Sequence, residues 1–357
     1  MNWAEVLRTY RGKRVFVTGH TGFKGTWLCM LLRELGAEVR GYALAPEPGK
    51  SHFALLGLDA KIQSVIGDIR DHAALSREID DFKPEFVFHL AAQALVRRSY
   101  ADPVGTISTN VVGSTHVMES VRHCESVRSF VYITSDKCYE NVEWVWGYRE
   151  TDALGGHDPY SASKAAAEIV FSAYARSFFA QRPALGAASA RAGNVIGGGD
   201  WAADRIVPDI VRSIEAGEPV QLRNPRATRP WQHVLEPLGG YVMLGARLFM
   251  EPRRFPGAWN FGPTTQKVRT VHAVTLAIIE HLKRGKVELA ADTSGPHEAH
   301  LLQLNCDKAH QELGWYPRWD VDQTLAATAG WYAAVLGGES AEAVTRRQIH
   351  EYFPELT

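Results

Sequence analysis

The sequence from Arg14 to Gly25 reads RVFVTGHTGFKG. Its first five residues form a short β-branched and apolar run, which is typical of a buried strand. Gly19, Gly22 and Gly25 follow with the spacing G-x-x-G-x-x-G, and residues 27–35 then continue as an apolar helical stretch. Between a strand and a helix, backbone N–H groups can approach a pyrophosphate that sits at the helix N-terminus. We therefore predict a dinucleotide site here; an ordinary tight turn is the alternative.

Four further short apolar runs follow, and helical stretches lie between them. Strands that alternate with helices predict βαβ units and a parallel sheet. Each run carries apolar residues on both faces, as a sheet covered by helices on both sides requires. The predicted strands span residues 38–42, 64–68, 85–90 and 129–134, and the predicted helices run from about 71 to 81 and from about 106 to 123.

The pattern changes after about residue 190. Residues 193–200 are rich in turn formers and include three consecutive glycines, and several prolines follow. We predict an α/β fold with a Rossmann-type doubly wound parallel sheet in residues 1–190 and later returns to it at about 230–265. Residues 191–357 are expected to form mainly a smaller, mixed α/β substrate domain that is discontinuous in sequence.

Composition narrows the class of protein. The chain has 357 residues, of which 45% are apolar and 22% charged, as is usual for a globular protein. Its net charge of −1 points neither to nucleic acid nor to a membrane surface as a partner. No apolar run reaches the roughly 18–20 residues of a membrane span, and the N-terminus lacks the pattern of a signal peptide.

The cysteines and histidines suggest no metal site. Four cysteines are widely spaced without a CxxC pair, so we expect reduced thiols in a cytoplasmic protein rather than a disulfide framework or a zinc site. The segment His297-Glu298-Ala299-His300 spaces its histidines three apart and lacks the HExxH pattern of zinc hydrolases. The cysteines are Cys29, Cys124, Cys138 and Cys306.

Residues at the predicted strand ends complete the expected cofactor site. Asp68 can reach an adenine, although it can also cap the next helix. After the second strand the chain reads Tyr42-Ala43-Leu44, without the acidic residue that favours NAD or the arginine that suits NADP. NAD is our default and NADP stays open. Lys24 adds a positive charge beside the phosphates, or is a solvated helix residue. The predicted cofactor residues are Gly19, Thr21, Gly22, Phe23, Lys24, Gly25, Asp68, Ile69, Leu90, Ala91 and Ala92, together with Tyr160 and Lys164.

Tyr160 and Lys164 are the predicted core of a redox site. Four residues apart on a helix, they share one face, and Pro159 suits the start of that helix. The lysine charge should lower the pKa of the phenol, which can then accept a proton from a substrate hydroxyl as hydride leaves the carbon. Ser135, at the end of the fifth predicted strand, can hydrogen-bond the same hydroxyl. An exposed helical pair is the alternative, because YxxxK also occurs by chance.

Taken together, these residues resemble the extended short-chain dehydrogenase/reductases over nearly the whole chain. Within that superfamily the sequence resembles the nucleotide-sugar 4,6-dehydratases. The strings that carry the resemblance, besides the glycine loop, are TSDKCY at 134–139, RAGNVIGGGDW at 191–201 and RPWQHV at 229–234. The resemblance implies a cofactor that is reduced and reoxidised within one turnover. It also implies a homodimer that pairs through the helix of Tyr160 and the helix near residues 106–123, as a four-helix bundle.

The resemblance implies three chemical steps. Tyr160, with Ser135 and Lys164, removes the C4′ hydroxyl proton while hydride passes to the cofactor. Asp136 and Lys137 then serve as acid and base for loss of water across C5′ and C6′, and the hydride returns to C6′. Related dTDP-glucose dehydratases carry Asp-Glu where this chain has Asp136-Lys137. A lysine base must be neutral, so its pKa of about 10.4 would have to fall; the alternatives are electrostatic support of the enolate and a surface Asp-Lys pair.

Substrate contacts also follow from the resemblance. Asn194 and Arg229 match positions that contact the diphosphate, and Asn260, Arg205 and His297 are further candidates. A rival of the same fold is an epimerase or reductase, which would not need Asp136-Lys137. A rival from another class is a non-catalytic NAD(P)-sensing protein, against which the complete Ser135, Tyr160 and Lys164 set argues.

Overall fold

A seven-stranded sheet forms the centre of the computed structural model, which describes residues 2–222, 224–263, 269–289 and 301–356. The strand order is β11-β6-β5-β4-β1-β2-β3, and all neighbours run parallel. The predicted Rossmann-type sheet is therefore confirmed. The strands are β1 (Arg14–Thr18), β2 (Glu38–Ala43), β3 (Gln63–Ile66), β4 (Phe86–His89), β5 (Ser129–Ile133), β6 (Gly186–Arg191) and β11 (Gly257–Asn260).

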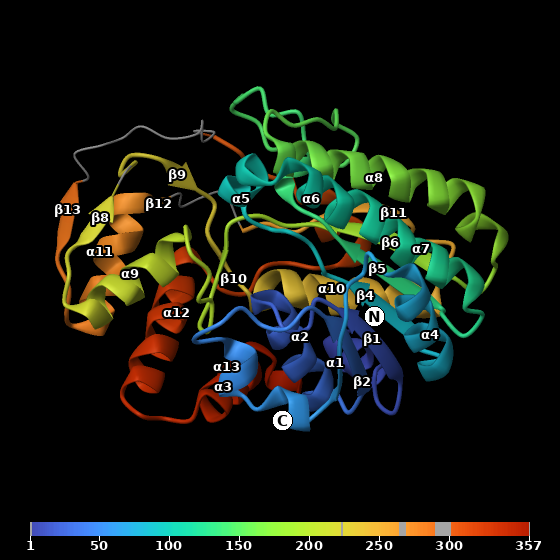
Figure 1. Cartoon of the computed structure of the whole chain (residues 1–357), viewed down its shortest axis with the longest axis horizontal. Helices are drawn as coiled ribbons and strands as arrows, with labels where there is room; N and C mark the ends of the chain where they lie inside the picture. Colours follow the sequence, from blue (N-terminus) through green and yellow to red (C-terminus); the bar gives the residue numbers. More distant parts are fainter. Residues whose placement is uncertain (1, 223, 264–268, 290–300, 357) are drawn as a thin grey trace.

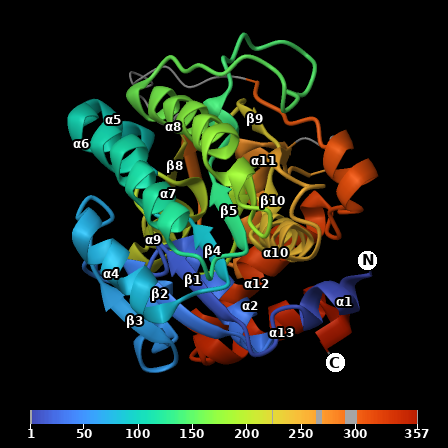
Figure 2. The ribbon, with the colours of Figure 1, turned by 90° about the vertical axis from the view of Figure 1, so that its right-hand side faces the viewer.

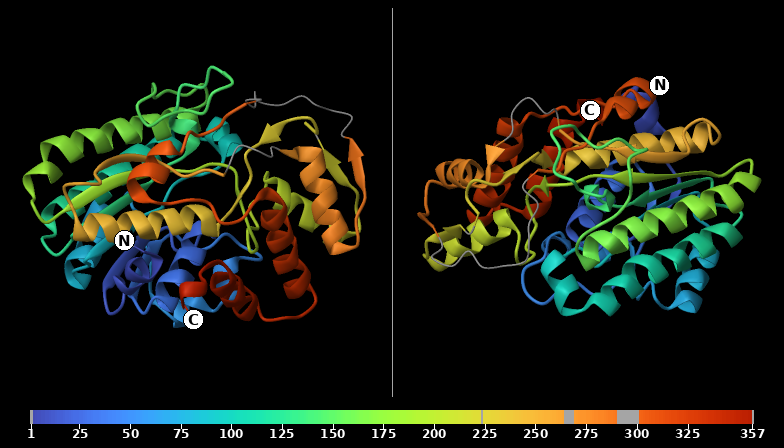
Figure 3. Two further views of the ribbon diagram at one scale, coloured as in Figure 1. Left: turned by 180° about the vertical axis from the view of Figure 1, so that it is seen from behind. Right: turned by 90° about the horizontal axis from the view of Figure 1, so that it is seen from above.

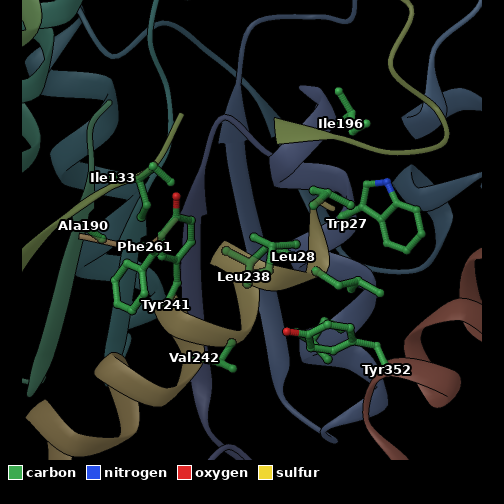
Figure 4. Close-up of a cluster of buried hydrophobic side chains, with 14 of the residues drawn as sticks. Trp27, Leu28, Ile133, Ala190, Ile196, Leu238, Tyr241, Val242, Phe261 and Tyr352 are labelled. Atoms are coloured by element: carbon green, nitrogen blue, oxygen red, sulfur yellow. The ribbon is translucent and has the colours of Figure 1, made fainter. Parts of the chain in front are cut away.

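Helices cover both faces of this sheet (Figure 2). Helices α4 (His72–Phe82), α7 (Ser114–His123) and α8 (Pro159–Ser177) pack on one face, and α2 (Phe23–Glu34) and α10 (Leu235–Met250) pack on the other. Because side chains alternate along a strand, Phe130 and Tyr132 of β5 join the core under α7 and α8, whereas Val131 and Ile133 join the opposite core. Figure 4 shows this second core, where Leu28 of α2 and Leu238 of α10 lie together.

The helix predicted from about 106 to 123 is divided into three parts. It consists of α6 (Pro103–Ile107), a π-helical segment (Ser108–Gly113) and α7. The wider turn places the fully buried side chain of Asn110 toward Gln93 and Ser163. Its amide oxygen accepts from Gln93 N at 2.8 Å, and its Nδ2 donates to Ser163 Oγ at 2.9 Å. A buried amide needs these partners, and they come from elements remote in sequence.

The C-terminal half alternates between the sheet and a smaller region beside it (Figures 1 and 3). Helix α10 and strand β11 return to the main sheet, while helices α9, α11 and α12 and three two-stranded sheets make the smaller region. These elements are α9 (Ile206–Ala216), α11 (Val271–Leu282) and α12 (Val321–Leu336), with β7 (Val195–Ile196) paired to β10 (Gln232–His233), β8 (Val220–Leu222) to β13 (Val287–Leu289), and β9 (Thr228–Arg229) to β12 (Arg269–Thr270).

Short helices and α13 (Ala341–Tyr352) complete the chain. α13 packs against the Rossmann-type part, where His52, the first residue of α3 (His52–Leu55), is hydrogen-bonded to Thr345 of α13 at 2.9 Å. None of the helices in the described ranges is long and apolar enough to cross a membrane. The remaining elements are α1 (Trp3–Arg8), α3 (His52–Leu55), η1 (Leu58–Ala60), α5 (Val96–Ala101), η3 (Asp136–Cys138), η4 (Phe179–Gln181), η5 (Ala309–Leu313) and η6 (Pro354–Leu356).

Candidate active site

A cavity of about 1450 Å³ lies at the carboxyl ends of the central strands. The loops after β1, β3, β4, β5 and β6 line one side, and residues of α9, β8 and β9 line the other. In doubly wound sheets, ligands bind at this edge where the strand order reverses, here between β1 and β4. A single small ligand usually occupies about 300–1,000 Å³. The cavity is therefore larger than a typical pocket for one small ligand.

The glycine loop forms one wall of the cavity. It joins β1 to α2, as predicted, and the predicted loop residues all line the cavity. Gly19 has φ of +78°, and a Cβ there would lie 2.7 Å from Ala91 N. A Cβ on Gly25 would lie 2.0 Å from Gly19 O. A side chain at either position would clash with the backbone and displace the loop whose N–H groups a pyrophosphate needs.

The predicted adenine end is lined by Asp68, Ile69 and Leu90-Ala91-Ala92. The Asp68 carboxylate is held by Arg70, whose Nη2 lies 2.5 Å and whose Nε lies 2.9 Å from Asp68 Oδ2. This charge-assisted hydrogen bond lowers the pKa of Asp68. The alternative that Asp68 caps the next helix is wrong, because the cap of α4 is Asp71, which accepts from Ala74 N at 3.0 Å.

His89 supports the turn at Leu90 and Ala91 and was not predicted from the sequence. Thr18 Oγ1 accepts from the backbone N–H groups of both turn residues at 3.2 Å, and it lies 2.6 Å from His89 Nδ1. The other ring nitrogen lies 2.8 Å from Ser114 Oγ. Burial lowers the pKa of His89 to about 3, so the ring is neutral. A histidine inside an otherwise apolar strand was the available signal.

The predicted catalytic residues all reach this cavity from two elements. Ser135 follows β5 and precedes the turn η3, and its hydroxyl donates to Asp136 Oδ1 at 2.9 Å. Tyr160 and Lys164 lie on α8, which begins at Pro159 as predicted and is capped by Asp158. All of these side chains are buried except Lys137, which is half-buried. The alternatives of an exposed Tyr–Lys pair and a surface Asp–Lys pair are therefore wrong.

Burial dominates the electrostatics of the pair on α8. It raises the pKa of Tyr160 to about 12, although a hydrogen bond with Ser135 and the charge of Arg205 act in the opposite direction. It lowers the pKa of Lys164 to about 8, against the charge of Glu168. The expected net lowering of the Tyr160 pKa is thus wrong for the chain alone, because desolvation of the phenolate outweighs the nearby positive charge.

Lys24 faces the reacting groups and is not a solvated helix residue. Burial lowers its pKa to about 8, and the charges of Arg205 and Lys164 act in the same direction, whereas Asp136 raises it. The site therefore brings the positive charges of Lys24, Lys164 and Arg205 close to Asp136. Such a cluster favours an anionic ligand or transition state.

Three of the five predicted substrate residues line the cavity: Asn194, Arg205 and Arg229. Asn194 has φ of +52° and donates from Nδ2 to Asp136 Oδ2 at 3.4 Å. Arg205 forms an ion pair at 2.9 Å with the buried Asp200, a residue that sequence reasoning missed. Arg229 donates to Thr228 O at 2.8 Å.

Asn260 lies outside this cavity. It is fully buried, its Oδ1 accepts from Tyr139 OH at 2.8 Å, and its Nδ2 donates to the carbonyls of Tyr148 and Asn305. This corrects the expectation of a diphosphate contact, because the protein already uses these amide atoms. His297 lies outside the described residues. In the parts of the chain that are described, no group of three or more His, Cys, Asp or Glu side chains is arranged to hold a metal ion.

The fold and the Ser135, Tyr160 and Lys164 set define an extended short-chain dehydrogenase/reductase. The family model of GDP-mannose 4,6 dehydratase matches residues 16–328, and the chain belongs to that family. It is 49% identical to a CDP-glucose 4,6-dehydratase of Salmonella typhimurium over 352 aligned residues, and the alignment covers 98% of each chain. It is 26% identical to a dTDP-glucose 4,6-dehydratase of Xanthomonas campestris over 88% of this chain and 92% of the relative.

Solved structures share the fold. A UDP-glucose 4-epimerase of Thermus thermophilus in complex with NAD superposes with a TM-score of 0.75 at 26% identity, covering 89% of this chain and 98% of that one. A dTDP-glucose 4,6-dehydratase of Bacillus anthracis in complex with NAD gives 0.74 at 20% identity, covering 97% and 100%. Epimerases and dehydratases thus share this architecture, and the fold alone does not separate the two activities.

Proposed function

We propose that this enzyme converts CDP-D-glucose to CDP-4-dehydro-6-deoxy-D-glucose and water. One observation carries the proposal: Asp136 and Lys137 line the same cavity as Tyr160, directly beside Ser135. A 4-epimerase or reductase needs no second acid and base, whereas a dehydratase must remove a C5′ proton and protonate the C6′ hydroxyl. The 49% identity to a CDP-glucose 4,6-dehydratase supports the choice of nucleotide.

We propose NAD as the cofactor. Gly19 and Gly25 leave the close approach that a pyrophosphate requires, and Asp68 faces the same cavity for the adenosine end. The NAD complexes of relatives with this fold support the assignment. When bound, NAD would supply a hydride acceptor that gives the hydride back within the same turnover. The end of β2 carries neither an acid nor an arginine, so NADP stays the alternative.

The residues of the chain move the protons. Ser135 and Tyr160 hold the C4′ hydroxyl, and Tyr160 takes its proton as the carbon is oxidised. Lys164 supplies positive charge beside the phenolate that the burial of Tyr160 otherwise disfavours. The resulting 4-ketone acidifies the C5′ proton. Asp136 gives a proton to the C6′ hydroxyl, so that water leaves, and Lys137 is either the C5′ base or an electrostatic support of the enolate.

A turnover screen tests this proposal. The purified chain with NAD is given CDP-, dTDP-, GDP- and UDP-hexoses, and products are identified by mass and NMR. We expect loss of water from CDP-glucose with no net consumption of NAD. An epimerised sugar, or net reduction of the cofactor, would favour the rival of the same fold. Absence of turnover on every nucleotide sugar would favour a sensing protein.

We also propose that the chain is a homodimer. Figure 2 shows α7 and α8 side by side on the outside of the sheet, and large apolar side chains stay exposed along this side of the molecule. Val104 and Ile107 of α6, which precedes α7 in the chain, are 77% and 48% exposed, and Ile169 of α8 is 58% exposed. Pairing of α7 and α8 with their copies as a four-helix bundle would cover such side chains. Light scattering at micromolar concentration should give twice the monomer mass; a monomer would contradict the proposal.

We place the protein in the cytoplasm. All four cysteines are buried free thiols, which fits a reducing compartment. Fractionation of the producing cells, with detection of the intact chain, tests this location, and recovery outside the cytoplasmic fraction would contradict it.

A further inference from the structure

Glu168 is a buried acid on the catalytic helix that the proposed chemistry does not use. It lies four residues after Lys164 and eight after Tyr160, so all three share one face of α8. Its side chain is 2% exposed and pairs with Arg191, which is 4% exposed. The pairing is bidentate: Arg191 Nε lies 2.9 Å from Oε1, and Nη2 lies 2.9 Å from Oε2.

This ion pair contacts the residues on both sides of the catalytic turn. Thr134, directly before Ser135, donates from Oγ1 to Glu168 Oε1 at 2.5 Å. Tyr139, directly after η3, accepts from Arg191 Nη1 at 2.7 Å. The carboxylate and the guanidinium therefore tie α8 to the ends of the segment that holds Ser135, Asp136 and Lys137.

A buried ion pair stabilises a packed helix less than its contacts suggest, because both charges lose their hydration. Removing two charges from water has a large desolvation cost, and apolar residues of similar size often stabilise a protein as well or better. Ser189 Oγ adds a further donor to Oε2 at 2.8 Å, so the carboxylate is fully hydrogen-bonded. Packing alone therefore does not explain the negative charge of Glu168. Lys164 is the neighbouring side chain whose positive charge this carboxylate can stabilise.

Besides Tyr160, one turn earlier on α8, the titratable groups that act on Lys164 are Glu168 on its own helix, Cys138 in η3, His89 of β4 and Lys24 of α2. Burial raises the pKa of Cys138 and lowers that of His89, so both are neutral near pH 7. Lys24 is positive and disfavours a second charge. The Glu168 carboxylate is thus the anion that opposes the loss of the Lys164 proton.

We infer that Glu168, held by Arg191, is a positioning residue of the reaction: it keeps Lys164 protonated and fixes α8 against the Ser135–Lys137 turn. The inference rests on the proposed function, because Lys164 acts there as the cation beside Tyr160. Glu168 and Arg191 touch no ligand space themselves, and neither lines the cavity.

The test compares Glu168→Gln with wild type in the full-length chain. Cofactor reduction is followed by nicotinamide absorbance in a single turnover with CDP-glucose, from pH 6 to pH 10. Removing the carboxylate charge leaves Arg191 uncompensated, and both effects lower the Lys164 pKa. The alkaline limb of the rate should therefore move to lower pH by about one unit, while the rate near pH 6.5 changes less. Lys24 also loses its proton near pH 8, but Glu168 does not act on it, so such a shift reports Lys164.

Two further variants separate charge from packing. Glu168→Asp keeps the charge with a shorter reach, and its alkaline limb should stay at the wild-type pH even where the rate falls. Glu236→Gln is the matched control: it makes the same isosteric change at a buried glutamate, outside the cavity, that accepts from Tyr352 OH at 2.5 Å. It should leave the pH profile unchanged.

A folded Glu168→Gln enzyme whose alkaline limb coincides with that of wild type overturns the inference. If Glu168→Gln does not fold, Thr134→Val carries the test. It removes the tie to Ser135 but keeps the charge, and should slow cofactor reduction about fivefold with KM little changed; an unchanged rate then overturns the inference. Failure of the wild-type chain to act on CDP-glucose contradicts the proposed function instead, and the same comparison then uses the nucleotide sugar that the chain does convert.

Discussion

Tyr160 meets Ser135 because a helix start and a strand end open into the same cavity. The phenol is desolvated, with its pKa raised to about 12, so it stays protonated until a substrate hydroxyl and positive charge are in place. The phenol must first lose this proton, with the help of the nearby positive charge, before the phenolate oxygen can accept the proton of the C4′ hydroxyl. The oxygen of Tyr160, rather than its ring, is thus the part that the reaction needs.

Tyr160→Phe tests that oxygen. The change deletes one atom in a packed site, so the fold and the thermal midpoint should change little. Turnover should fall well beyond tenfold, because the proton acceptor for C4′ oxidation is lost. If the variant keeps more than about a tenth of the wild-type rate, less than roughly 1.4 kcal/mol of the barrier depends on the oxygen, and the role of Tyr160 is misassigned.

Asp136→Asn separates dehydration from simple oxidation. It should spare Ser135, Tyr160 and Lys164, so the first hydride transfer survives while loss of water slows. Reduced cofactor should therefore accumulate in a single turnover, since the hydride cannot return to C6′ before water leaves. Lys137→Met should give the same signature if Lys137 is the C5′ base. Wild-type rates in both variants, with no reduced cofactor, would make Asp136 and Lys137 structural.

At the residue scale, most of the predicted residues that line the cavity lie in strings where strands end. The glycine loop, Ser135-Asp136-Lys137 and Tyr160-Lys164 carry their own spacing and lie where strands end. Asn260 lies in a plausible string, but its amide is used by Tyr139, Tyr148 and Asn305. Those partners are 45 to 121 residues away in sequence, so no local pattern reveals them.

At the scale of elements, the turn from β1 into α2 tolerates added side chains least. A Cβ on Gly25 would lie 2.0 Å from Gly19 O. The first turn of α2 can therefore pack against the loop only if residue 25 has no side chain. The strands and α8 could be predicted from periodicity and from Pro159. The π-helical segment Ser108–Gly113 could not, because it depends on the bonds of Asn110 to Gln93 and Ser163.

Gly25→Ala should displace the loop and weaken NAD binding by at least about tenfold, measured by calorimetry. Gly330→Ala is the matched control. Gly330 lies in α12, a Cβ there meets nothing within 4 Å, and alanine is the better helix former by up to about 1 kcal/mol. The control should keep wild-type affinity and gain stability. Equal NAD affinity in Gly25→Ala and wild type would contradict this role of the loop.

At the scale of the whole molecule, the chain leaves the Rossmann-type part and returns to it more than once. The turn-rich change after residue 190 predicted a smaller region, and its bounds stay a prediction. Helices α10 and α13 pack back on the first part through contacts that no local pattern shows. His52 is one such contact. It is buried between Trp27 and Trp331, with ring centroids 5.3 and 5.2 Å away, and is hydrogen-bonded to Thr345 of α13.

Because His52 is buried, we expect the free energy of unfolding to fall in acid. Burial lowers the pKa of His52 to about 3 in the folded chain, whereas an unfolded histidine titrates near 6.5. Below about pH 6.5, His52 is protonated in the unfolded chain but stays neutral in the folded chain. The free energy of unfolding therefore falls as the pH falls toward 3. At pH 5 the loss from this one group is about 2 kcal/mol. Urea unfolding at pH 7 and pH 5 should show that wild type loses roughly this much more than His52→Gln, whose side chain stays neutral. The comparison uses the change in unfolding free energy between the two pH values within each protein, so any destabilisation caused by the substitution itself cancels. Equal losses of unfolding free energy in the two proteins would show that His52 is not buried in its neutral form.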